Sequence, residues 1–386
     1  MAPLIVVLVV AATFLVHWQG TTRRAMGDTY WYARAAQLAV GVPEPVASTR
    51  AADLSCREIT RAHALGSQPV PCTGGYPALA SPRYRAIFDS RPGYPLLAAP
   101  AVAVLGPWKG LALTTAALFV LLGLVTYFAG RISGLSPPAS AIGACALAVL
   151  PVGYWNSRLL ADGPGLLAII VALTGGLVVL RGRAAAGVPL MITGLATACT
   201  IKPASAMAAA MALMIAGVAL GVRPQRWLPR GRRRPGWVLA AVALGCLAAW
   251  WSIAHLLGLP SLTETAQDLA TRHFSRPDVA DPLRLLGRRA VALWVHGAPV
   301  RLGLPWPLAL VLPACGYLIW RLRARGWLWT AISLAPIAVV TAHPMASEYL
   351  RLIAPCWVAV ALAAGALVDQ LAGLARPDRD ARRMAR

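Results

Sequence analysis

Long runs of apolar residues, separated by short polar stretches, limit most strongly what this chain can fold into. Hydrophobic residues make up 58% of the 386 residues and charged residues only 13%, whereas a soluble domain carries about 25% charge. Backbone in contact with lipid must satisfy its hydrogen bonds internally, and the runs have helical length without the alternation of barrel strands. The sequence therefore predicts an all-α polytopic membrane protein.

We expect about ten or eleven apolar segments in a single integral-membrane domain, residues 1–386, several of them shorter than the ~20 residues of a perpendicular span. The first segment lacks a basic start and a cleavage pattern, so we expect it to be retained rather than removed as a signal peptide. The segments are Pro3–Val16, Tyr94–Leu105, Gly110–Gly130, Pro137–Tyr154, Gly163–Leu180, Val188–Thr200, Ala204–Val222, Gly236–Leu257, Leu304–Trp320, Trp327–Ala342 and Leu352–Leu371.

Short basic loops at the ends of these segments carry much of the net charge of +22. Basic loops face the cytoplasm in membrane proteins, so we expect a multi-pass protein of the plasma membrane with both termini in the cytoplasm. No basic groove interleaved with aromatic residues accompanies the charge, which argues against nucleic-acid binding. The basic positions are Arg181, Arg183, the linker 223–235, Arg321, Arg323, Arg325 and the tail 372–386.

Two long loops then face outward, residues 18–93 and 257–302. The first contains helical stretches at Tyr30–Val40 and Ala51–Leu65, and the second at Thr263–His273 and Pro282–Trp294. We expect these helices to lie along the membrane surface.

The topology has one internal conflict between residues 94 and 154. Three apolar segments separate the first outer loop from Asp162, and three full crossings would place the two on opposite sides of the membrane. We expect one of the three, most simply Tyr94–Leu105, not to cross fully.

Two of the seven cysteines, Cys56 and Cys72, fall in the first outer loop. Outside the cytosol a disulfide between them is a reasonable hypothesis, whereas the other cysteines lie in apolar segments as small buried hydrophobic residues.

Asp28 is the leading candidate functional residue, in the run Gly27-Asp28-Thr29-Tyr30-Trp31-Tyr32 just after the first apolar segment. Only 14 residues of the chain are acidic, and a carboxylate among aromatics at a bilayer edge is a functional hypothesis. Asp28 would act as a general base or orient an acceptor. The alternative is an N-cap for the following helix.

Asp162 ends the polar stretch Tyr154–Asp162 between two apolar segments. It is a second candidate catalytic carboxylate facing the same cavity, or else a helix cap or an ion-pair partner of Arg158. Lys202 lies in Thr200-Ile201-Lys202-Pro203, between two apolar segments. A charged ammonium group near the bilayer is unfavourable in free energy unless it pairs with an anion or extends to the aqueous interface. A lipid phosphate is one candidate partner.

Basic and aromatic residues gather where the chain re-enters the membrane, in Arg83-Tyr84-Arg85 and Arg91-Pro92-Gly93-Tyr94. Arginines at such a place can hold a phosphate through two hydrogen bonds, or they contact headgroups while Tyr94 joins an interfacial aromatic belt.

Arg351 begins the last apolar segment on the outer side, although basic residues at the ends of membrane spans prefer the cytoplasmic side. An anionic ligand or a pairing with Glu348 would explain this position. His343 and Glu348 fit no metal-ligand spacing, so no cofactor is expected, although a divalent metal stays open. The candidate substrate-binding residues are Tyr32, Arg85, Arg91, Tyr94, Arg158, Lys202, His343, Glu348 and Arg351.

In order along the chain, these motifs resemble the GT-C superfamily of integral-membrane glycosyltransferases. That group includes protein O-mannosyltransferases, aminoarabinose transferases and polyprenyl-phosphomannose-dependent mannosyltransferases. The matching pieces are Gly27–Ala33, Arg91-Pro92-Gly93-Tyr94-Pro95, Arg158 to Pro164, Lys202-Pro203 and Tyr349-Leu350-Arg351 with Pro355.

The resemblance implies sugar transfer, usually inverting, from a polyprenyl-phosphate-sugar donor to a glycan, lipid or protein acceptor at the outer face. Asp28 would be the base, and Arg91, Lys202 and Arg351 would neutralise the leaving phosphate. The first loop lacks an acidic pair at Asp28, and the chain has no large soluble C-terminal domain. The first departure argues against a metal-dependent mechanism, and the second implies a small acceptor or missing acceptor-recognition modules.

Two other function classes stay open. A transporter or flippase for a lipid-linked glycan would require polar residues along a path through the bilayer and related halves, neither of which the sequence shows. A non-catalytic membrane scaffold would tolerate the loss of Asp28.

Overall fold

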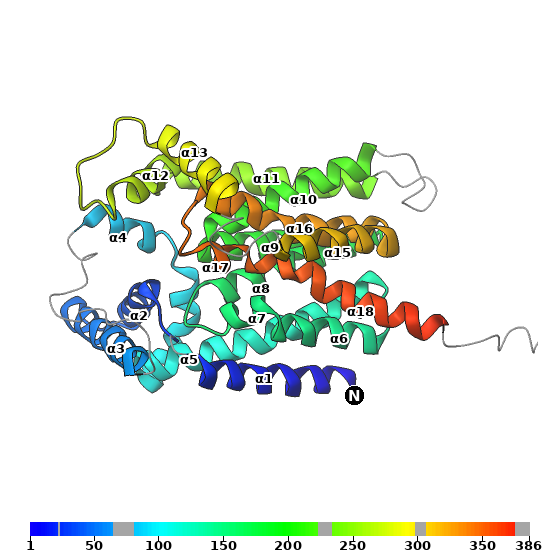
Figure 1. The fold of residues 1–386 in the computed structure, drawn as a ribbon, viewed down its shortest axis with the longest axis horizontal. Coiled ribbons are helices and arrows are strands. Elements are labelled where there is room, and N and C mark those ends of the chain that lie inside the picture. The colour runs from blue at the N-terminus through cyan, green and yellow to red at the C-terminus, as the bar shows by residue number, and fades with distance from the viewer. Residues whose placement is uncertain (22–23, 65–80, 223–233, 298–305, 375–386) are drawn as a thin grey trace, which may run out of the picture.

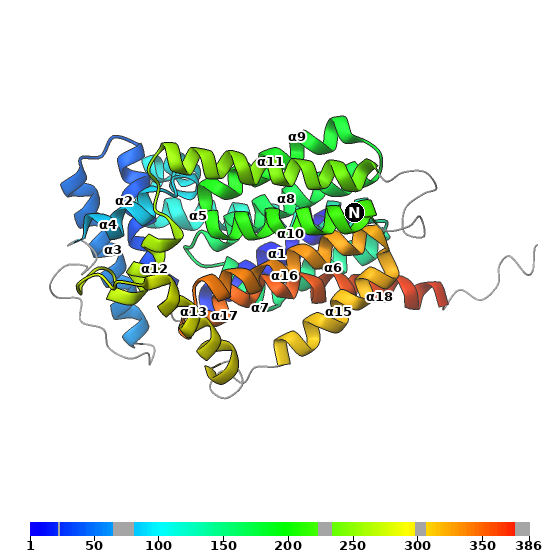
Figure 2. The ribbon, with the colours of Figure 1, turned by 90° about the horizontal axis from the view of Figure 1, so that it is seen from above.

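A computed structural model describes the chain except for residues 22–23, 65–80, 223–233, 298–305 and 375–386. The described residues are helical, contain no strand, and include eight helices long and apolar enough to cross a membrane. Figures 1 and 2 show most of these helices side by side along the long axis of the molecule. The predicted all-α polytopic membrane fold is confirmed.

The helices follow the apolar segments and the outer-loop stretches closely. Proline supplies the first turn of several of them, where its missing N–H costs nothing. The elements are α1 Ala2–Gly20, α2 Gly27–Ala39, α3 Glu44–Ala64, α4 Pro82–Asp89, α5 Gly93–Ser133, α6 Pro137–Val149, α7 Pro151–Asn156, α8 Asp162–Leu180, α9 Ala184–Ile201, α10 Pro203–Val222, α11 Arg234–Leu256, α12 Leu262–Thr271, α13 Pro282–Ala292, η2 Leu293–Gly297, α15 Trp306–Leu322, α16 Ala324–Ala342, α17 Tyr349–Ile353, η3 Ala354–Cys356 and α18 Trp357–Leu374.

Residues 94–154 explain the topological conflict. The segment Tyr94–Leu105 forms the first part of α5, which leaves the helical conformation at Gly106, where φ is 76° and ψ is 170°. A Cβ on Gly110 would lie 2.6 Å from the Cα of Val102, so the part of α5 after Gly106 packs back against the part before it. The third segment, Pro137–Tyr154, is divided at Pro151 into α6 and α7. The part of α5 after Gly106 runs along the bundle and α6 and α7 run back (Figure 1). Asp162 is thereby close to Asp28, and the two share Arg351 as a partner.

Helix α8 is the centre of the bundle, since 89% of its most apolar stretch is buried. Helix α9 packs closely against it through glycines. A Cβ on Gly194 would lie 2.4 Å from the backbone nitrogen of Ala172, and one on Gly175 would lie 2.4 Å from that of Met191. Lys202 directly follows the end of α9 at Ile201.

Among the described residues, Arg181 and Arg325 of the basic loops lie close together at one end of the bundle. Arg181 donates to the carbonyl of Arg131 at 3.2 Å, and Arg325 donates to that of Ser133 at 2.6 Å. The opposite end carries α2, α3, α4, α12 and α13 (Figures 1 and 2).

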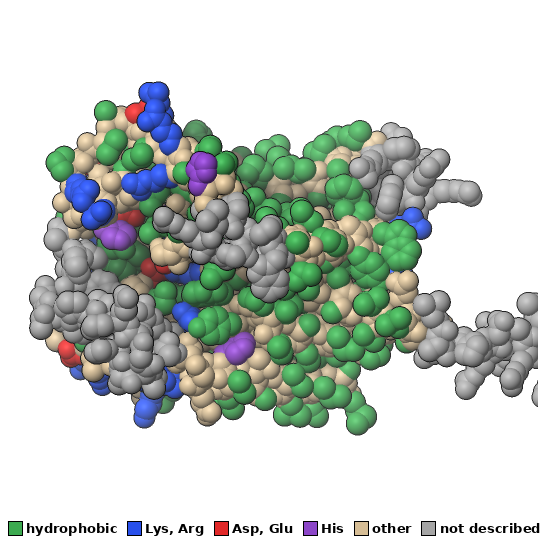
Figure 3. All heavy atoms as spheres, in the orientation of Figure 1, with side chains coloured by type: hydrophobic (Ala, Val, Ile, Leu, Met, Phe, Trp, Pro, Cys, Tyr) green, Lys and Arg blue, Asp and Glu red, His purple; other side chains and the backbone are tan. Residues whose placement is uncertain are grey.

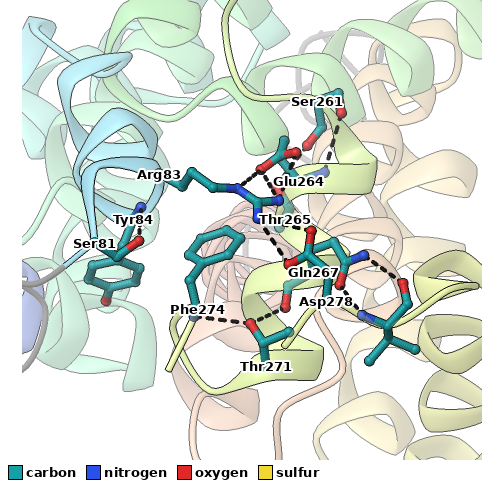
Figure 4. Close-up of polar contacts among 11 residues, drawn as sticks. Ser81, Arg83, Tyr84, Ser261, Glu264, Thr265, Gln267, Thr271, Phe274 and Asp278 are labelled. Carbon is teal, nitrogen blue, oxygen red and sulfur yellow. Dashed lines mark hydrogen bonds and ion pairs between the residues drawn. The ribbon is translucent and has the colours of Figure 1, made fainter. Parts of the chain in front are cut away.

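A polar cluster joins the two outer loops at that opposite end. Arg83 of α4 donates to Glu264 of α12 and to Asp278, in each case at 2.9 Å, and its guanidinium lies 4.4 Å from the ring centre of Phe274. Figure 4 shows these side chains converging on Arg83. Cys56 of α3 is disulfide-bonded, but Cys72 lies outside the described residues, so the proposed pair stays a prediction.

Candidate functional site

Backbone and hydroxyl groups bring the start of α2 against the loop that precedes α8. Thr29 donates from its hydroxyl to the carbonyl of Leu159 at 2.8 Å, and Leu159 donates its N–H to the carbonyl of Arg24 at 3.1 Å. The same hydroxyl accepts from the N–H of Met26 at 2.9 Å. Residues 130 positions apart are thus held together, and Asp28 and Asp162 are placed beside each other.

Arg351 of α17 joins the two aspartates. It donates to Asp28 Oδ2 at 2.7 Å and to Asp162 Oδ2 at 2.9 Å, and also to Glu348 Oε2 at 2.9 Å. Lys202 contacts the second oxygen of Asp162 at 2.5 Å. Segments from four parts of the chain therefore meet in one network of three carboxylates and two cations.

The five members of this Arg351 network differ in exposure. The side chains of Asp162 and Arg351 are 5% and 9% exposed, whereas that of Asp28 is 25% exposed. A buried carboxylate requires partners, and Asp162 has one on each oxygen. Asp28 bonds Arg351 through Oδ2 alone and is open enough to meet a ligand.

Neither alternative based on helix capping holds. Helix α2 begins at Gly27 with Met26 as N-cap, so Asp28 lies within the first turn. Asp162 is the first residue of α8 and does not cap it through its side chain. Both carboxylates are instead engaged with basic residues from distant parts of the chain.

Three further predicted residues surround the network. Burial raises the pKa of Tyr32, and the negative charge of Asp28 raises it further, while Arg91 and Arg351 act in the opposite direction. Burial lowers the pKa of His343, and the charge of Arg91 lowers it again. Arg91 lies over the ring of Phe88 at 5.6 Å and has no carboxylate within ion-pair distance among the described residues.

A hollow opens at this end of the molecule. Figure 3 shows acidic, basic and histidine side chains together inside it, below the surface formed by α12 and α13. The remaining visible surface of the bundle is largely apolar. In the Arg351 network, the side chains of Asp28 and Glu348 are each 25% exposed, so these two carboxylates are the ones that a ligand can reach.

Three predicted residues lie elsewhere. Arg158 bonds Tyr154 and lies over the rings of Tyr154 and Trp155 at 4.4 and 4.3 Å, so it does not pair with Asp162. Arg85 pairs with Glu44 and Asp89 at 2.8 and 3.1 Å. Tyr94 is buried with its hydroxyl 2.7 Å from that of Thr115, where it supports Tyr32 through an edge-on ring contact at 5.3 Å.

The sequence interpretation missed a pair in the second outer loop. His273 Nδ1 lies 3.0 Å from Asp268 Oδ1. This hydrogen bond is the main cause that raises the pKa of His273, and the charge of Asp28 adds to it. The only signal in the sequence is an Asp and a His five residues apart at a helix end, which by itself does not point to a site.

No group of three or more His, Cys, Asp or Glu side chains able to hold a metal ion occurs among the residues that the structure describes. A cavity of about 420 Å³ lies at the basic end, where Arg321, Arg323 and Asp369 contribute to its lining. It contains none of the predicted site residues.

Comparison of the sequence with models of protein families and with curated proteins gave no match. The function therefore has to be argued from the Arg351 network and its surroundings.

Proposed function

We propose that this protein is a membrane glycosyltransferase that moves a sugar from a polyprenyl-phosphate donor to an acceptor hydroxyl at the outer face of the plasma membrane. The observation that supports this most is the convergence of Asp28 and Asp162 on Arg351, with Lys202 alongside. Carboxylates and cations from four segments meet at the edge of an apolar bundle, where a lipid-linked substrate would present its phosphate and sugar.

Asp28 takes the role of base in this proposal because it is the accessible aspartate of the network. Asp162 is a positioning residue, since Lys202 and Arg351 occupy both of its oxygens. Arg351 orients Asp28 through one nitrogen. Arg91, with no carboxylate partner among the described residues, is the first candidate to bind the donor phosphate, and Tyr32 lines the same space.

The reaction is a substitution at the anomeric carbon. The acceptor oxygen forms a bond to that carbon while the bond to the phosphate oxygen breaks, and its electron pair stays on the phosphate. The acceptor proton passes to Asp28. Positioned general bases contribute about 10²–10⁴ to rate, and cations beside the phosphate stabilise the negative charge that develops there.

The distribution of polar residues favours a transferase over a flippase or transporter. The charged network lies at one end of the bundle, and the central helix α8 has no ionisable residue after Asp162. A transport path through the bilayer would require polar groups at several depths.

The test is transfer from radiolabelled polyprenyl-phosphate sugars in membranes that contain the wild type or Asp28→Asn. We expect the wild type to transfer, and the variant to lose about 10²-fold or more, because an amide accepts no proton. Asp53→Asn is the matched control, since Asp53 is an exposed aspartate in the same outer loop without an ion pair among the described residues.

Both variants must be equally abundant and folded. Unchanged transfer by Asp28→Asn would remove Asp28 from the chemistry and leave Asp162 as the candidate. If the wild type transfers from no donor, the glycosyltransferase proposal fails, and a flippase or a scaffold becomes the better account.

A further inference from the structure

The end of α12 holds an aspartate and a histidine in an arrangement suited to proton transfer. An ionised carboxylate only accepts hydrogen bonds, so the 3.0 Å contact places a proton on Nδ1 of His273 and directs it at Asp268. The Asp268 side chain is 9% exposed and that of His273 is 53% exposed. Nε2 is therefore the nitrogen that the imidazole offers to its surroundings.

The backbone around His273 is strained. Arg272, His273 and Phe274 have φ of 54°, 62° and 56° in succession, a conformation that residues with a Cβ adopt rarely and at a cost in free energy. Local hydrogen bonds hold it. The N–H of His273 donates to the carbonyl of Asp268 at 3.0 Å, and the N–H of Phe274 donates to the Thr271 hydroxyl at 3.0 Å.

Helix α4 of the first outer loop contacts this turn and α12. The ring of Tyr84 lies 4.5 Å from the His273 ring, and Arg83 holds the two ends of the turn through Glu264 and Asp278 (Figure 4). The Asp268–His273 pair is thereby kept at the end of the bundle that carries Asp28.

We propose that His273, oriented by Asp268, donates a proton to the leaving phosphate in the reaction proposed above, on which this inference rests. When the bond between the anomeric carbon and the phosphate oxygen breaks, its electron pair remains on that oxygen. The proton of Nε2 passes to the same oxygen, which leaves a neutral imidazole and a singly charged polyprenyl phosphate. The acceptor proton goes to Asp28, and both side chains then exchange protons with water.

Several charged or titratable groups act on His273. Asp268 lies near the end of α12, just before His273, and Asp28 comes from α2. The ring of Tyr84 of α4 packs against the imidazole. The two carboxylates favour the protonated imidazole. A proton donor of this kind gives an activity that falls as pH rises through the pKa of the donor.

The experiment is the pH dependence of kcat and kcat/KM for transfer by the wild type, Asp268→Asn and His273→Gln. In Asp268→Asn we expect the alkaline limb of the profile, where activity falls as pH rises, to move to lower pH. The pKa of His273 falls in this variant because the imidazole loses its hydrogen bond to an ionised partner. In His273→Gln we expect kcat to fall by about 10²-fold or more with little change in KM, and the alkaline limb to disappear. Asp53→Asn, at the exposed aspartate of α3, is the control for Asp268→Asn, and we expect it to leave the pH dependence unchanged.

A second readout does not depend on activity. Carbethoxylation of His273, followed by peptide mass spectrometry across pH, reports its titration in the folded protein. We expect the midpoint in the wild type to lie above that in Asp268→Asn. Equal midpoints, or an unchanged alkaline limb in His273→Gln, would overturn the inference. Absence of transfer by the wild type would instead overturn the proposed function, and the role of His273 with it.

Discussion

At the scale of single residues, Arg351 is the position on which the site depends most. One guanidinium serves three carboxylates from α2, α8 and the residue before α17. Removing one partner of a buried pair leaves an uncompensated charge, which costs about 3–5 kcal/mol. We therefore expect Arg351→Gln to lower the free energy of unfolding by about 3 kcal/mol or more, measured in a denaturant titration of the purified protein in micelles.

Arg351→Lys separates charge from geometry. An ammonium keeps the charge but lacks the planar fork that bonds several carboxylates at once, so we expect its stability to lie between those of the wild type and Arg351→Gln. The double variant Asp162→Asn/Arg351→Gln should lose less than the sum of the two single variants, because each removes the same interaction. Additive losses would show that Arg351 and Asp162 do not stabilise each other.

The sequence identifies charged residues next to apolar segments, where a charge without a partner is unfavourable in free energy. It indicates a shared cavity for Asp28 and Asp162, a possible pairing of Glu348 with Arg351, and Lys202 as a further candidate, and the structure joins all five in one network. Arg85 and Arg158 look the same in the sequence but have partners of their own, because pairing depends on which segments fold together. Asp268 and His273 carry no such signal, since polar residues are common in outer loops.

At the scale of elements, glycines decide how closely α8 and α9 approach. A Cβ on Gly194 would lie 2.4 and 2.7 Å from backbone atoms of Ala172 and Ala168, so a helix must move to admit it. Overpacking of this kind costs about 1–3 kcal/mol. We expect Gly194→Ala to destabilise the protein by that amount, and to weaken transfer in the proposed reaction because Lys202 follows α9.

Gly245 provides the matched control. It lies in α11, and a Cβ at this position would meet no atom within 4 Å among the described residues. Alanine is favoured over glycine in a helix by about 0.8–1.0 kcal/mol, so Gly245→Ala should be neutral or stabilising. Equal destabilisation by both variants in the same titration would mean that helix α9 does not depend on close packing at Gly194.

Helix positions can be predicted well because they follow from hydrophobicity. The outer-loop stretches predicted at Tyr30–Val40 and Thr263–His273 correspond to α2 and α12. The break in α5 at Gly106 agrees with the two separate apolar segments predicted there, Tyr94–Leu105 and Gly110–Gly130. The direction that the chain takes after Gly106 is not predicted, because it depends on the close contact between Gly110 and Val102, which the sequence pattern does not contain.

At the scale of the whole molecule, the charged groups are divided between two ends of an apolar bundle. The contacts of Arg181 and Arg325 lie at one end and the Arg351 network at the other (Figure 1). Because basic loops stay in the cytoplasm, the network should face outward. This orientation is required by the proposed donor chemistry and can be tested without any knowledge of the substrate.

Cysteine labelling in intact cells tests the orientation directly. Ser275→Cys lies in the second outer loop beside His273, and Arg183→Cys lies in the basic loop before α9. We expect a membrane-impermeant maleimide to label Ser275→Cys in intact cells, and Arg183→Cys only after the cells are opened. The parent protein, labelled in parallel, accounts for reaction at the native cysteines. The reverse pattern would place the Arg351 network in the cytoplasm, where a donor at the outer face could not reach Asp28.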